Sequence, residues 1–198
     1  PHREQATLGG LIATNFSGPR RYGQGTLRDY VIGISAVDGR GVPFHGGGRV
    51  VKNVAGYDFC KLLIGSLGTI GIVTQATLKV KPVPEASALV VHDVADFAQA
   101  EKLLAALVTA RTTPTAIGLL AGPAWANDPA LGATDTAAAR LVVGLEGSGL
   151  EVESMQSQLL REWAELGAAA GRLVPHDQTA GLWERMTEFP AEHPGLTF

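Results

Sequence analysis

Glycine is concentrated in the segment from Gly46 to Pro82, and the same segment ends in a long run typical of a β-strand. It reads GGGRVVKNVAGYDFCKLLIGSLGTIGIVTQATLKVKP. Because glycine has no Cβ, its backbone can come within hydrogen-bonding distance of a ligand or of another backbone. An ordinary core of packed side chains does not need so many glycines beside a strand. The segment therefore predicts a backbone surface that something else approaches closely.

A second glycine-rich segment, TLGGLIATNFSGPRRYG, covers residues 7–23. Successive amides around a tight turn form a concavity that binds anions, so this segment suits a pyrophosphate. The alternative is a glycine-rich loop between packed elements, and the glycines alone do not decide between the two. The segment is neither a Walker loop nor a Rossmann fingerprint, because no Gly-Lys-Ser/Thr follows and no glycine triad joins a strand to a helix.

Three glycines at three-residue spacing, Gly65, Gly68 and Gly71, stand directly ahead of the predicted strand. They permit the close approach of another backbone or of a flat ring, and Ile72 and Val73 then offer apolar surface beside main-chain donors and acceptors. That combination favours the edge of a flavin or an adenine.

Charge divides the chain into two units. Residues 1–83 hold 10 Lys/Arg and 4 Asp/Glu, which gives +6, whereas residues 84–198 hold 6 and 15, which gives −9. Pro82 and Pro84 lie at the junction, where proline continues neither a strand nor a helix easily. We therefore expect one domain over residues 1–83 and a second over residues 84–198.

The first domain is expected to be α+β with antiparallel pairing. Residues 30–37 predict a buried strand, 41–45 its hairpin partner and 71–80 a third, half-buried strand. Residues 58–64 suit a short helix with Asp58 as its cap.

The second domain alternates strands and helices in the order βαβ-βαβ. Strands are predicted at 86–91, 116–120, 140–145 and 172–174, and helices at 93–109 and 150–170. This order is the ferredoxin-like pattern, a sheet with its helices on one face. On the first of these helices we expect an inward face made of Phe97, Leu103, Leu104 and Leu107.

Several functions are disfavoured by composition. A run of 18 apolar residues is absent from the 198, and the single Cys60 excludes an internal disulfide framework. The five histidines show no paired ligand spacing, so we expect no metal site. Arginines spread among glycines with few aromatic residues do not predict nucleic-acid binding. A reducing, cytoplasmic setting is expected.

The segments at residues 7–33 and 49–82 resemble the second half of the FAD-binding domain of FAD-linked oxidases of the vanillyl-alcohol oxidase type. Within this superfamily they are most similar to the FAD-binding E subunits of bacterial glycolate oxidase. The resemblance is strong over roughly residues 5–83 and extends to the rest only in outline. It implies the second subdomain of a PCMH-type FAD-binding domain, followed by a ferredoxin-like cap domain that is truncated.

By this resemblance the chain would bind FAD non-covalently. The backbone of Gly9, Gly10 and Gly18 would line the flavin and diphosphate, and Thr14 and Asn15 would lie nearby. The remaining residues implied at the cofactor are Tyr22 and Gly23, which would continue the loop, and Gly71 and Ile72, which would close around it. Arg20 or Arg21 would add charge to the phosphates, unless each is simply solvated.

Substrate binding is implied for Trp183 and Arg185, because family cap domains approach the substrate in a similar region and arginine binds carboxylates bidentately. The alternative is an amphipathic helix that packs Leu182, Trp183, Met186 and Phe189 inward. No catalytic residue is identified.

Relatives that oxidise D-lactate commonly carry Gly-Ser-Glu-Gly-Thr where this chain has Leu67 in the glutamate position. We therefore expect a subunit of glycolate oxidase, which takes part in oxidising glycolate to glyoxylate. Its expected partners are a second flavin subunit, an iron-sulfur subunit and a small 2-hydroxy acid, with contact to the inner membrane face only through those subunits. A stand-alone D-lactate or D-2-hydroxy acid dehydrogenase and a non-catalytic structural subunit stay open.

The family's FAD-binding domain normally begins with another subdomain, whose glycine-rich loop also holds the diphosphate. No counterpart precedes Pro1 in this sequence. We therefore expect the 198 residues alone to bind FAD weakly or not at all.

Overall fold

The computed structural model describes residues 4–50, 56–134, 136–168 and 171–192, and it shows an α+β chain with two antiparallel sheets. The chain forms two compact units. The first contains Pro1–Gly18, Gly25–Pro82 and Glu188–Phe198, and the second contains Pro19–Gln24 and Val83–Thr187. The units change at Pro82/Val83, close to the expected boundary, but neither unit is one continuous segment: Pro19–Gln24 is grouped with the second unit and Glu188–Phe198 with the first.

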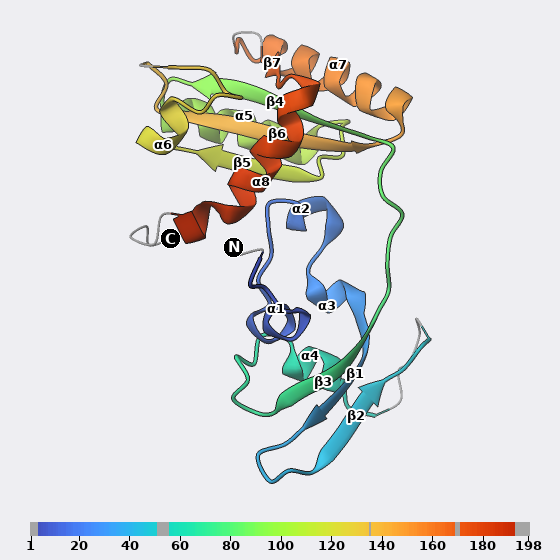
Figure 1. The fold of residues 1–198 in the computed structure, drawn as a ribbon. Helices are drawn as coiled ribbons and strands as arrows, with labels where there is room; N and C mark the ends of the chain where they lie inside the picture. The colour runs from blue at the N-terminus through green and yellow to red at the C-terminus, as the bar shows by residue number, and fades with distance from the viewer. Residues whose placement is uncertain (1–3, 51–55, 135, 169–170, 193–198) are drawn as a thin grey trace. The chain divides into compact units, whose positions relative to one another are not determined.

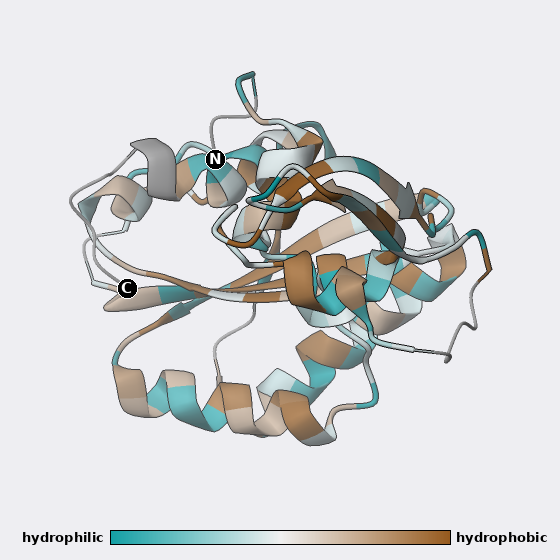
Figure 2. Cartoon of the chain, turned by 90° about the horizontal axis from the view of Figure 1, so that it is seen from below, coloured by the Kyte–Doolittle hydropathy of each residue, from teal (hydrophilic) through white to brown (hydrophobic). Residues whose placement is uncertain are grey.

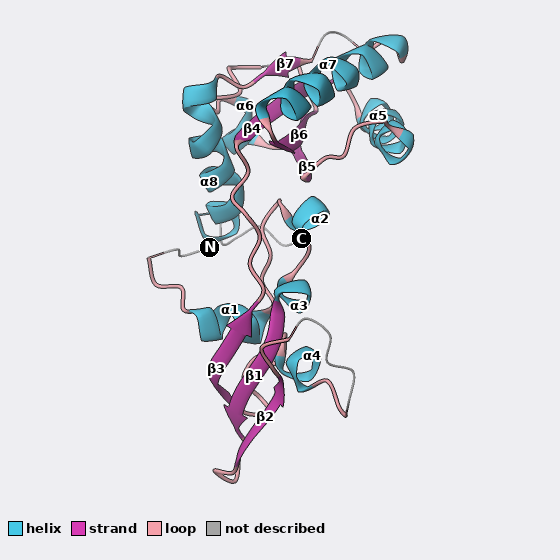
Figure 3. Ribbon diagram, turned by 90° about the vertical axis from the view of Figure 1, so that its right-hand side faces the viewer, coloured by secondary structure: helices cyan, strands magenta, loops and turns pink. Residues whose placement is uncertain are grey.

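The first unit is built on a three-stranded sheet in the order β2-β1-β3 (Figure 3). The strands are β1 (Val31–Val37), β2 (Pro43–Gly47) and β3 (Ile72–Leu78), and both pairings are antiparallel. At the β1–β2 turn the Asp38 carboxylate accepts the backbone N–H of Arg40 and of Val42, and these hydrogen bonds lower its pKa. All three predicted strands are therefore present.

Short helices pack on this sheet and close a small core. They are α1 (Leu8–Thr14), α3 (Leu27–Tyr30) and α4 (Phe59–Leu63). Asp58 caps α4 as predicted, because its carboxylate accepts the Lys61 N–H at 3.0 Å. The buried residues of the core come from α1, β1 and α4 and are Ile12, Val31, Ile34, Ala36, Cys60, Leu63 and Ile64.

The second unit has the ferredoxin-like order. Its sheet runs β5-β6-β4-β7, with every neighbouring pair antiparallel. The strands are β4 (Ala86–Val94), β5 (Ala116–Leu120), β6 (Ala139–Gly147) and β7 (Arg172–Leu173). The helices are α5 (Phe97–Thr109) and α7 (Gly149–Glu165), with the short α2 (Arg21–Gln24) and α6 (Pro123–Ala126) at the edges.

Helices cover both faces of this sheet, whereas the sequence predicted them on one face only. Alternate residues of β6, such as Val143 and Leu145, join the core under α5 and α7. Side chains alternate along a strand, so Gly144 faces the other way, toward Trp183 of α8 (His176–Glu192). Figure 1 shows α8 crossing the sheet on the side opposite α5 and α7.

The additional helix is amphipathic like the others, and Figure 2 shows helices that carry both hydrophobic and hydrophilic residues along their length. Of the four residues that the packed alternative turns inward, Leu182, Trp183 and Met186 are buried and Phe189 is half-buried. The sequence order βαβ-βαβ gives no place to a third helix, so the second face of the sheet could not be assigned from that pattern.

Candidate functional site

The two glycine-rich segments meet in the first unit, at the C-terminal end of α1. Ile12 O accepts two backbone N–H groups, that of Asn15 at 3.3 Å and that of Gly65 at 3.0 Å. Ala13 O accepts the Leu67 N–H at 2.8 Å. The end of α1 is therefore joined by main-chain hydrogen bonds to the loop that precedes β3, and Asn15 is the predicted cofactor residue that takes part in these bonds.

Asn15 and Leu67 are the non-glycine residues with positive φ among those described, at 51° and 53°. This left-handed conformation is disfavoured for residues with a Cβ and costs about 1–2 kcal/mol each. Strained backbone of this kind gathers at functional sites when the surrounding structure holds it in place. Here both strained residues belong to the same small junction.

The junction also contains a buried polar atom. Asn15 Oδ1 is inaccessible to solvent and has no hydrogen-bond partner among the described residues. A buried amide oxygen without a donor is unfavourable by about 1–3 kcal/mol. A donor from a bound group would remove that cost, so Asn15 is suited to contact a ligand that supplies an N–H or O–H.

Gly9, Gly10 and Thr14 lie within helix α1. The glycines had suggested a tight turn here, and the structure has a helix instead. Thr7 caps the helix, and its Oγ1 accepts the Gly10 N–H at 3.0 Å. Thr14 Oγ1 donates to Gly10 O at 2.9 Å. A Cβ on Gly9 would have no atom within 4 Å, so its backbone is open to close approach from outside. The first amides of a helix have no acceptor inside it.

Ile72 begins β3, Gly71 directly precedes it, and Gly18 lies in the loop after α1. A Cβ on Gly71 would come within 2.8 Å of Val37 O, so contact with β1 accounts for this glycine without any ligand. Ile72 is exposed, as are Ile70 and Leu67, whose side chain is 71% exposed. Three exposed apolar side chains close together in sequence are suited to a flat apolar ligand.

Tyr22 and Gly23 lie in α2, which belongs to the second unit. The Gly23 N–H donates to Thr115 O at 2.9 Å, and a Cβ there would come within 2.7 Å of Thr115 Cα. Close packing against the protein's own backbone therefore accounts for Gly23. The structure does not bring these two residues together with Gly9, Gly10 and Asn15 in one unit, and their cofactor role stays a prediction.

Arg20 is engaged within the second unit. Its Nε donates to Glu146 Oε1 at 2.6 Å, and its guanidinium lies 4.0 Å from the ring centroid of Trp183. The sequence did not indicate Glu146, because it is 126 positions from Arg20 and lies in none of the motifs identified in the sequence. Arg21 is exposed, and its role at the phosphates stays a prediction.

Trp183 and Arg185, the predicted substrate residues, both have partners inside the second unit. Trp183 is buried and its Nε1 donates to Ser87 Oγ at 3.3 Å. Arg185 donates twice to the buried carboxylate of Asp128, at 2.6 and 2.9 Å. A bidentate pair of this kind occupies the guanidinium edge that a substrate carboxylate would need. The substrate role of both residues therefore stays a prediction that these contacts do not support.

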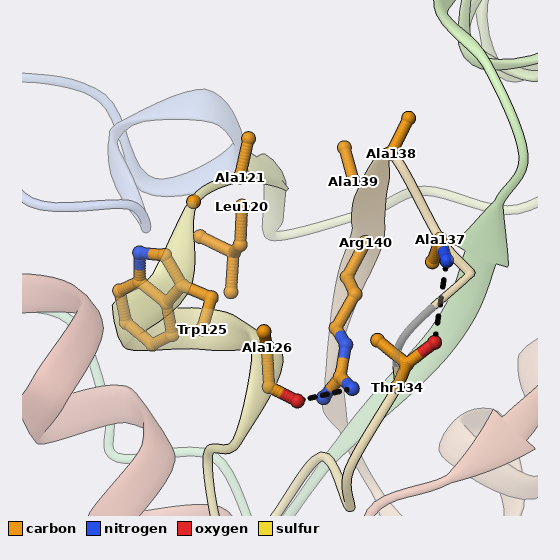
Figure 4. Close-up of a pocket in the computed structure, with 10 residues that line it drawn as sticks. Leu120, Ala121, Trp125, Ala126, Thr134, Ala137, Ala138, Ala139 and Arg140 are labelled. Carbon is orange, nitrogen blue, oxygen red and sulfur yellow. Dashed lines mark hydrogen bonds between the residues drawn. The ribbon is translucent and has the colours of Figure 1, made fainter.

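A small cavity of about 20 Å³ lies between α6 and β6, beside Arg140 (Figure 4). The Arg140 side chain is buried and donates to Ala126 O and Gly132 O. Burial lowers its pKa, although Asp93 opposes this effect. The volume suffices for about one water molecule and excludes a flavin or a 2-hydroxy acid.

The described part of the chain contains no cluster of three His, Cys, Asp or Glu side chains placed to hold a metal ion. Among its helices, none combines the length and the apolar composition that a membrane span requires.

Comparisons with known proteins find relatives among the glycolate oxidase subunits and D-lactate dehydrogenases. No family model matches the chain. Over 88 residues it is 47% identical to the glycolate oxidase subunit GlcE of Escherichia coli K12, which covers 44% of this chain and 25% of that protein. It is 36% identical over 118 residues to glycolate oxidase subunit GlcD of Bacillus subtilis, covering 60% and 25%. A D-lactate dehydrogenase of Archaeoglobus fulgidus is 44% identical over 82 residues, covering 41% and 18%.

These relatives are FAD-linked oxidases, and the chain spans a quarter or less of the length of each of the three. Among solved structures, an alkyldihydroxyacetonephosphate synthase superimposes with a TM-score of 0.71 at 24% identity, over 96% of this chain and 37% of that one. This likeness is one of fold. It confirms the predicted α+β class, with a PCMH-type subdomain followed by a ferredoxin-like domain.

Proposed function

We propose that this chain is part of an FAD-dependent oxidoreductase that acts on 2-hydroxy acids. More specifically, we propose an FAD-binding subunit of a glycolate oxidase, which converts glycolate to glyoxylate. The proposal rests first on the junction between α1 and the loop Gly65–Leu67, where two non-glycine residues are held at positive φ beside the buried, unpaired Oδ1 of Asn15. The similarity to two glycolate oxidase subunits supports the same function.

In this proposal the first unit supplies one wall of the FAD site. The open backbone at Gly9 would lie beside the diphosphate, because no atom stands within 4 Å of the place where its Cβ would be. Asn15 would accept a hydrogen bond from the flavin, and the exposed Leu67, Ile70 and Ile72 would cover part of an apolar ring face. When bound, FAD would supply the two-electron acceptor that oxidation of a 2-hydroxy acid requires.

Leu67 bears on the choice between subunit and independent enzyme. Its exposed side chain has no group that could hold a proton or bind a hydroxy acid, whereas relatives that oxidise D-lactate commonly have glutamate at this place. The chain's residues at the junction therefore serve binding and orientation of the cofactor. Its partners in this proposal are a second flavin subunit and an iron-sulfur subunit.

The cofactor site is tested with the full-length protein that contains this chain, titrated with FAD after the bound flavin has been removed. In Gly65→Ala the new Cβ strains a residue at φ 81° and lies 3.4 Å from Asn15 Cβ. Gly41→Ala is the matched control, because φ is 79° and a Cβ there meets nothing within 4 Å. Both variants carry similar backbone strain, but only the first disturbs the junction.

We expect Gly65→Ala to weaken FAD binding by about tenfold, a loss equivalent to roughly 1.4 kcal/mol, while Gly41→Ala binds as the wild type does. Equal FAD affinity in the two variants would show that the junction is not part of the cofactor site. An absence of FAD binding by the wild-type protein would reject the proposed function as a whole.

A stand-alone dehydrogenase is the second candidate, favoured by the 44% identity to a D-lactate dehydrogenase. The two functions separate when the purified full-length protein is mixed anaerobically with glycolate or D-lactate and the flavin absorbance is followed. Bleaching only after the partner subunits are added supports the subunit. Bleaching without partners supports the independent enzyme, and bleaching in neither case supports a structural subunit.

A further inference from the structure

Glu146 lies at the C-terminal end of β6, and its carboxylate is bound by a segment that is remote in sequence. We call this segment, Pro19–Gln24, the strap. Arg20 Nε donates to Oε1 at 2.6 Å, and Gln24 Nε2 donates to Oε2 at 3.2 Å. The side chain of Glu146 is only 5% exposed. Both carboxylate oxygens of a nearly buried acid are therefore satisfied by the strap.

Arg20 has a second partner on the same part of the second unit. Its guanidinium lies over the ring of Trp183, and Trp183 donates to Ser87. Ser87 is paired with Glu146 across the β4–β6 ladder. One guanidinium thus contacts a carboxylate and an aromatic ring that are anchored to neighbouring strands. Such a cation is held more firmly than one in an isolated surface pair.

Gly23 provides an independent anchor. Its N–H donates to Thr115 O at 2.9 Å, at the start of β5. A Cβ at this position would come within 2.8 Å of Pro114 O and still closer to Thr115. Because both contacts are with backbone, the protein could relieve the clash only by moving the strap or the strand. The strap is therefore packed on the sheet at two separate places.

We propose that the strap is a docking element that ties the candidate cofactor segment to the second unit, and that Arg20 is the positioning residue that holds it. The peptide bond between Gly18 and Pro19 joins the end of the segment Gly9–Gly18 directly to the strap. Release of the strap from the sheet would therefore give the segment Gly9–Gly18 more conformational freedom. The part of the proposal that concerns FAD rests on the proposed function, whereas docking of the strap does not.

The same geometry gives Arg20 a different role from the one suggested by sequence. As a phosphate ligand it would act on the cofactor alone. As the partner of Glu146 it acts through the strap, because loss of Arg20 leaves a nearly buried carboxylate without its cation. FAD binding to the segment Gly9–Gly18 would then also favour the docked strap. Coupling of this kind is reciprocal, so docking of the strap would favour FAD binding.

Hydrogen exchange on the full-length protein without FAD tests the docking. The variants are Arg20→Met and Glu146→Gln, with Arg21→Met as the matched control, since Arg21 is adjacent and exposed. We expect the amides of residues 22–24 to exchange about tenfold or more faster in the first two variants, because local opening replaces a closed state. Arg21→Met should exchange as the wild type, and Arg20→Lys should restore part of the protection. Equal exchange in Arg20→Met and Arg21→Met would overturn the proposal.

FAD titration of the same proteins tests the coupling. We expect Arg20→Met and Glu146→Gln to bind FAD several-fold more weakly than the wild type. A different pattern would contradict the proposal. In that pattern Arg20→Met binds FAD more weakly, the amides of residues 22–24 exchange as in the wild type, and Glu146→Gln binds FAD normally. Arg20 would then be a phosphate ligand. If the wild type binds no FAD, the proposed function fails, and the exchange result still decides whether the strap is docked.

If Arg20→Met does not fold, Gly23→Ala gives the same information. It leaves the ion pair intact and disturbs only the second anchor, so residues 22–24 should again lose protection. Retained protection in this variant would show that the strap is not packed on Thr115, and the proposal would fall.

Discussion

Gly144 leaves the space on the sheet that the Trp183 ring occupies. A Cβ at this position would lie 2.5 Å from Trp183 Cη2, inside the buried layer between α8 and the sheet. We expect Gly144→Ala to destabilise the second unit by about 1–3 kcal/mol, since overpacking forces the ring or the helix to shift. Urea unfolding followed by tryptophan fluorescence measures this, because Trp125, Trp163 and Trp183 all belong to the second unit.

Gly149→Ala is the control for that variant. Gly149 lies in the first turn of α7, and the nearest atom to an added Cβ is 3.9 Å away. Alanine is the better helix former, so the control should leave the second unit as stable or stabilise it by up to about 1 kcal/mol. If the two variants unfold at the same urea concentration, Trp183 does not pack on Gly144 as described.

For single residues, the sequence indicated where another group comes close to the backbone. It did not indicate whether that group is a ligand or another part of the protein. Gly23 and Gly71 are both required by contact with the protein's own backbone, at Thr115 and Val37. A ligand and a neighbouring strand make the same demand on a glycine, so its presence cannot distinguish them. The strained conformation of Leu67 was also hidden, although its place between Gly65 and Gly68 in a tight turn is a signal that could have suggested it.

Whole elements were far easier to predict. The strand at 116–120 matches β5 residue for residue, and the strand predicted at 140–145 lies within β6. These segments have strong periodicity, which local sequence carries. Phe97 was predicted to face inward, and this was wrong, since it is 64% exposed. It occupies the first turn of α5, directly after the cap Asp96, and the buried face of the helix begins at Ala100.

Helix α7 begins with a capping box. Ser148 Oγ accepts the Glu151 N–H, and the Glu151 carboxylate accepts the Ser148 N–H at 2.8 Å. We expect Ser148→Ala to destabilise the second unit by about 1 kcal/mol, the usual effect of removing a serine cap. Ser148→Thr keeps the hydroxyl and should preserve most of that stability. The same fluorescence-detected urea unfolding measures both, and equal losses would mean that the hydroxyl does not cap α7.

The cap also predicts a pH dependence. The hydrogen bond from the Ser148 backbone lowers the pKa of Glu151. A carboxyl group whose pKa is depressed on folding stabilises the native state above its unfolded pKa, and this contribution is lost as the pH falls through the folded value. Glu151→Gln should therefore remove part of the acid-range decline in stability while leaving the pH dependence above neutrality unchanged. An unaltered acid-range slope, from unfolding midpoints measured across pH, would contradict this assignment.

For the molecule as a whole, the chain spans about a quarter of the glycolate oxidase subunits that it matches. The first unit supplies one wall of the proposed cofactor site, so we expect purified residues 1–198 to retain FAD weakly or not at all. The full-length protein should retain it. A visible flavin spectrum that survives gel filtration of the 198-residue chain would contradict this expectation.

The strap gives a second prediction at this scale. In the intact chain Glu146→Gln removes the charge that Arg20 pairs with and should lower stability. In an isolated fragment of residues 83–187 Glu146 has neither Arg20 nor Gln24, so the same substitution breaks no ion pair and should change stability little. Unfolding midpoints of the four proteins test this difference, and an equal loss of stability in both backgrounds would rule it out.

Long-range pairing of this sort explains the limit of prediction for the fold. Charge and proline placement predicted a junction after residue 83, but no sequence pattern predicted that Arg20 would pair with Glu146, 126 positions away. Their pairing follows from how the finished sheet presents the end of β6, which local sequence does not encode.

Because the strap packs with the second unit, that unit is not a continuous length of chain, and neither is the first. Exchange of domains between related proteins at the proline-rich junction would therefore transplant an incomplete part. A chimaera cut only at Pro82/Val83 would keep Arg20 and Gln24 from one parent and Glu146 from the other. A chimaera that keeps the second unit intact has to take residues 19–24 and the ferredoxin-like sheet from the same parent.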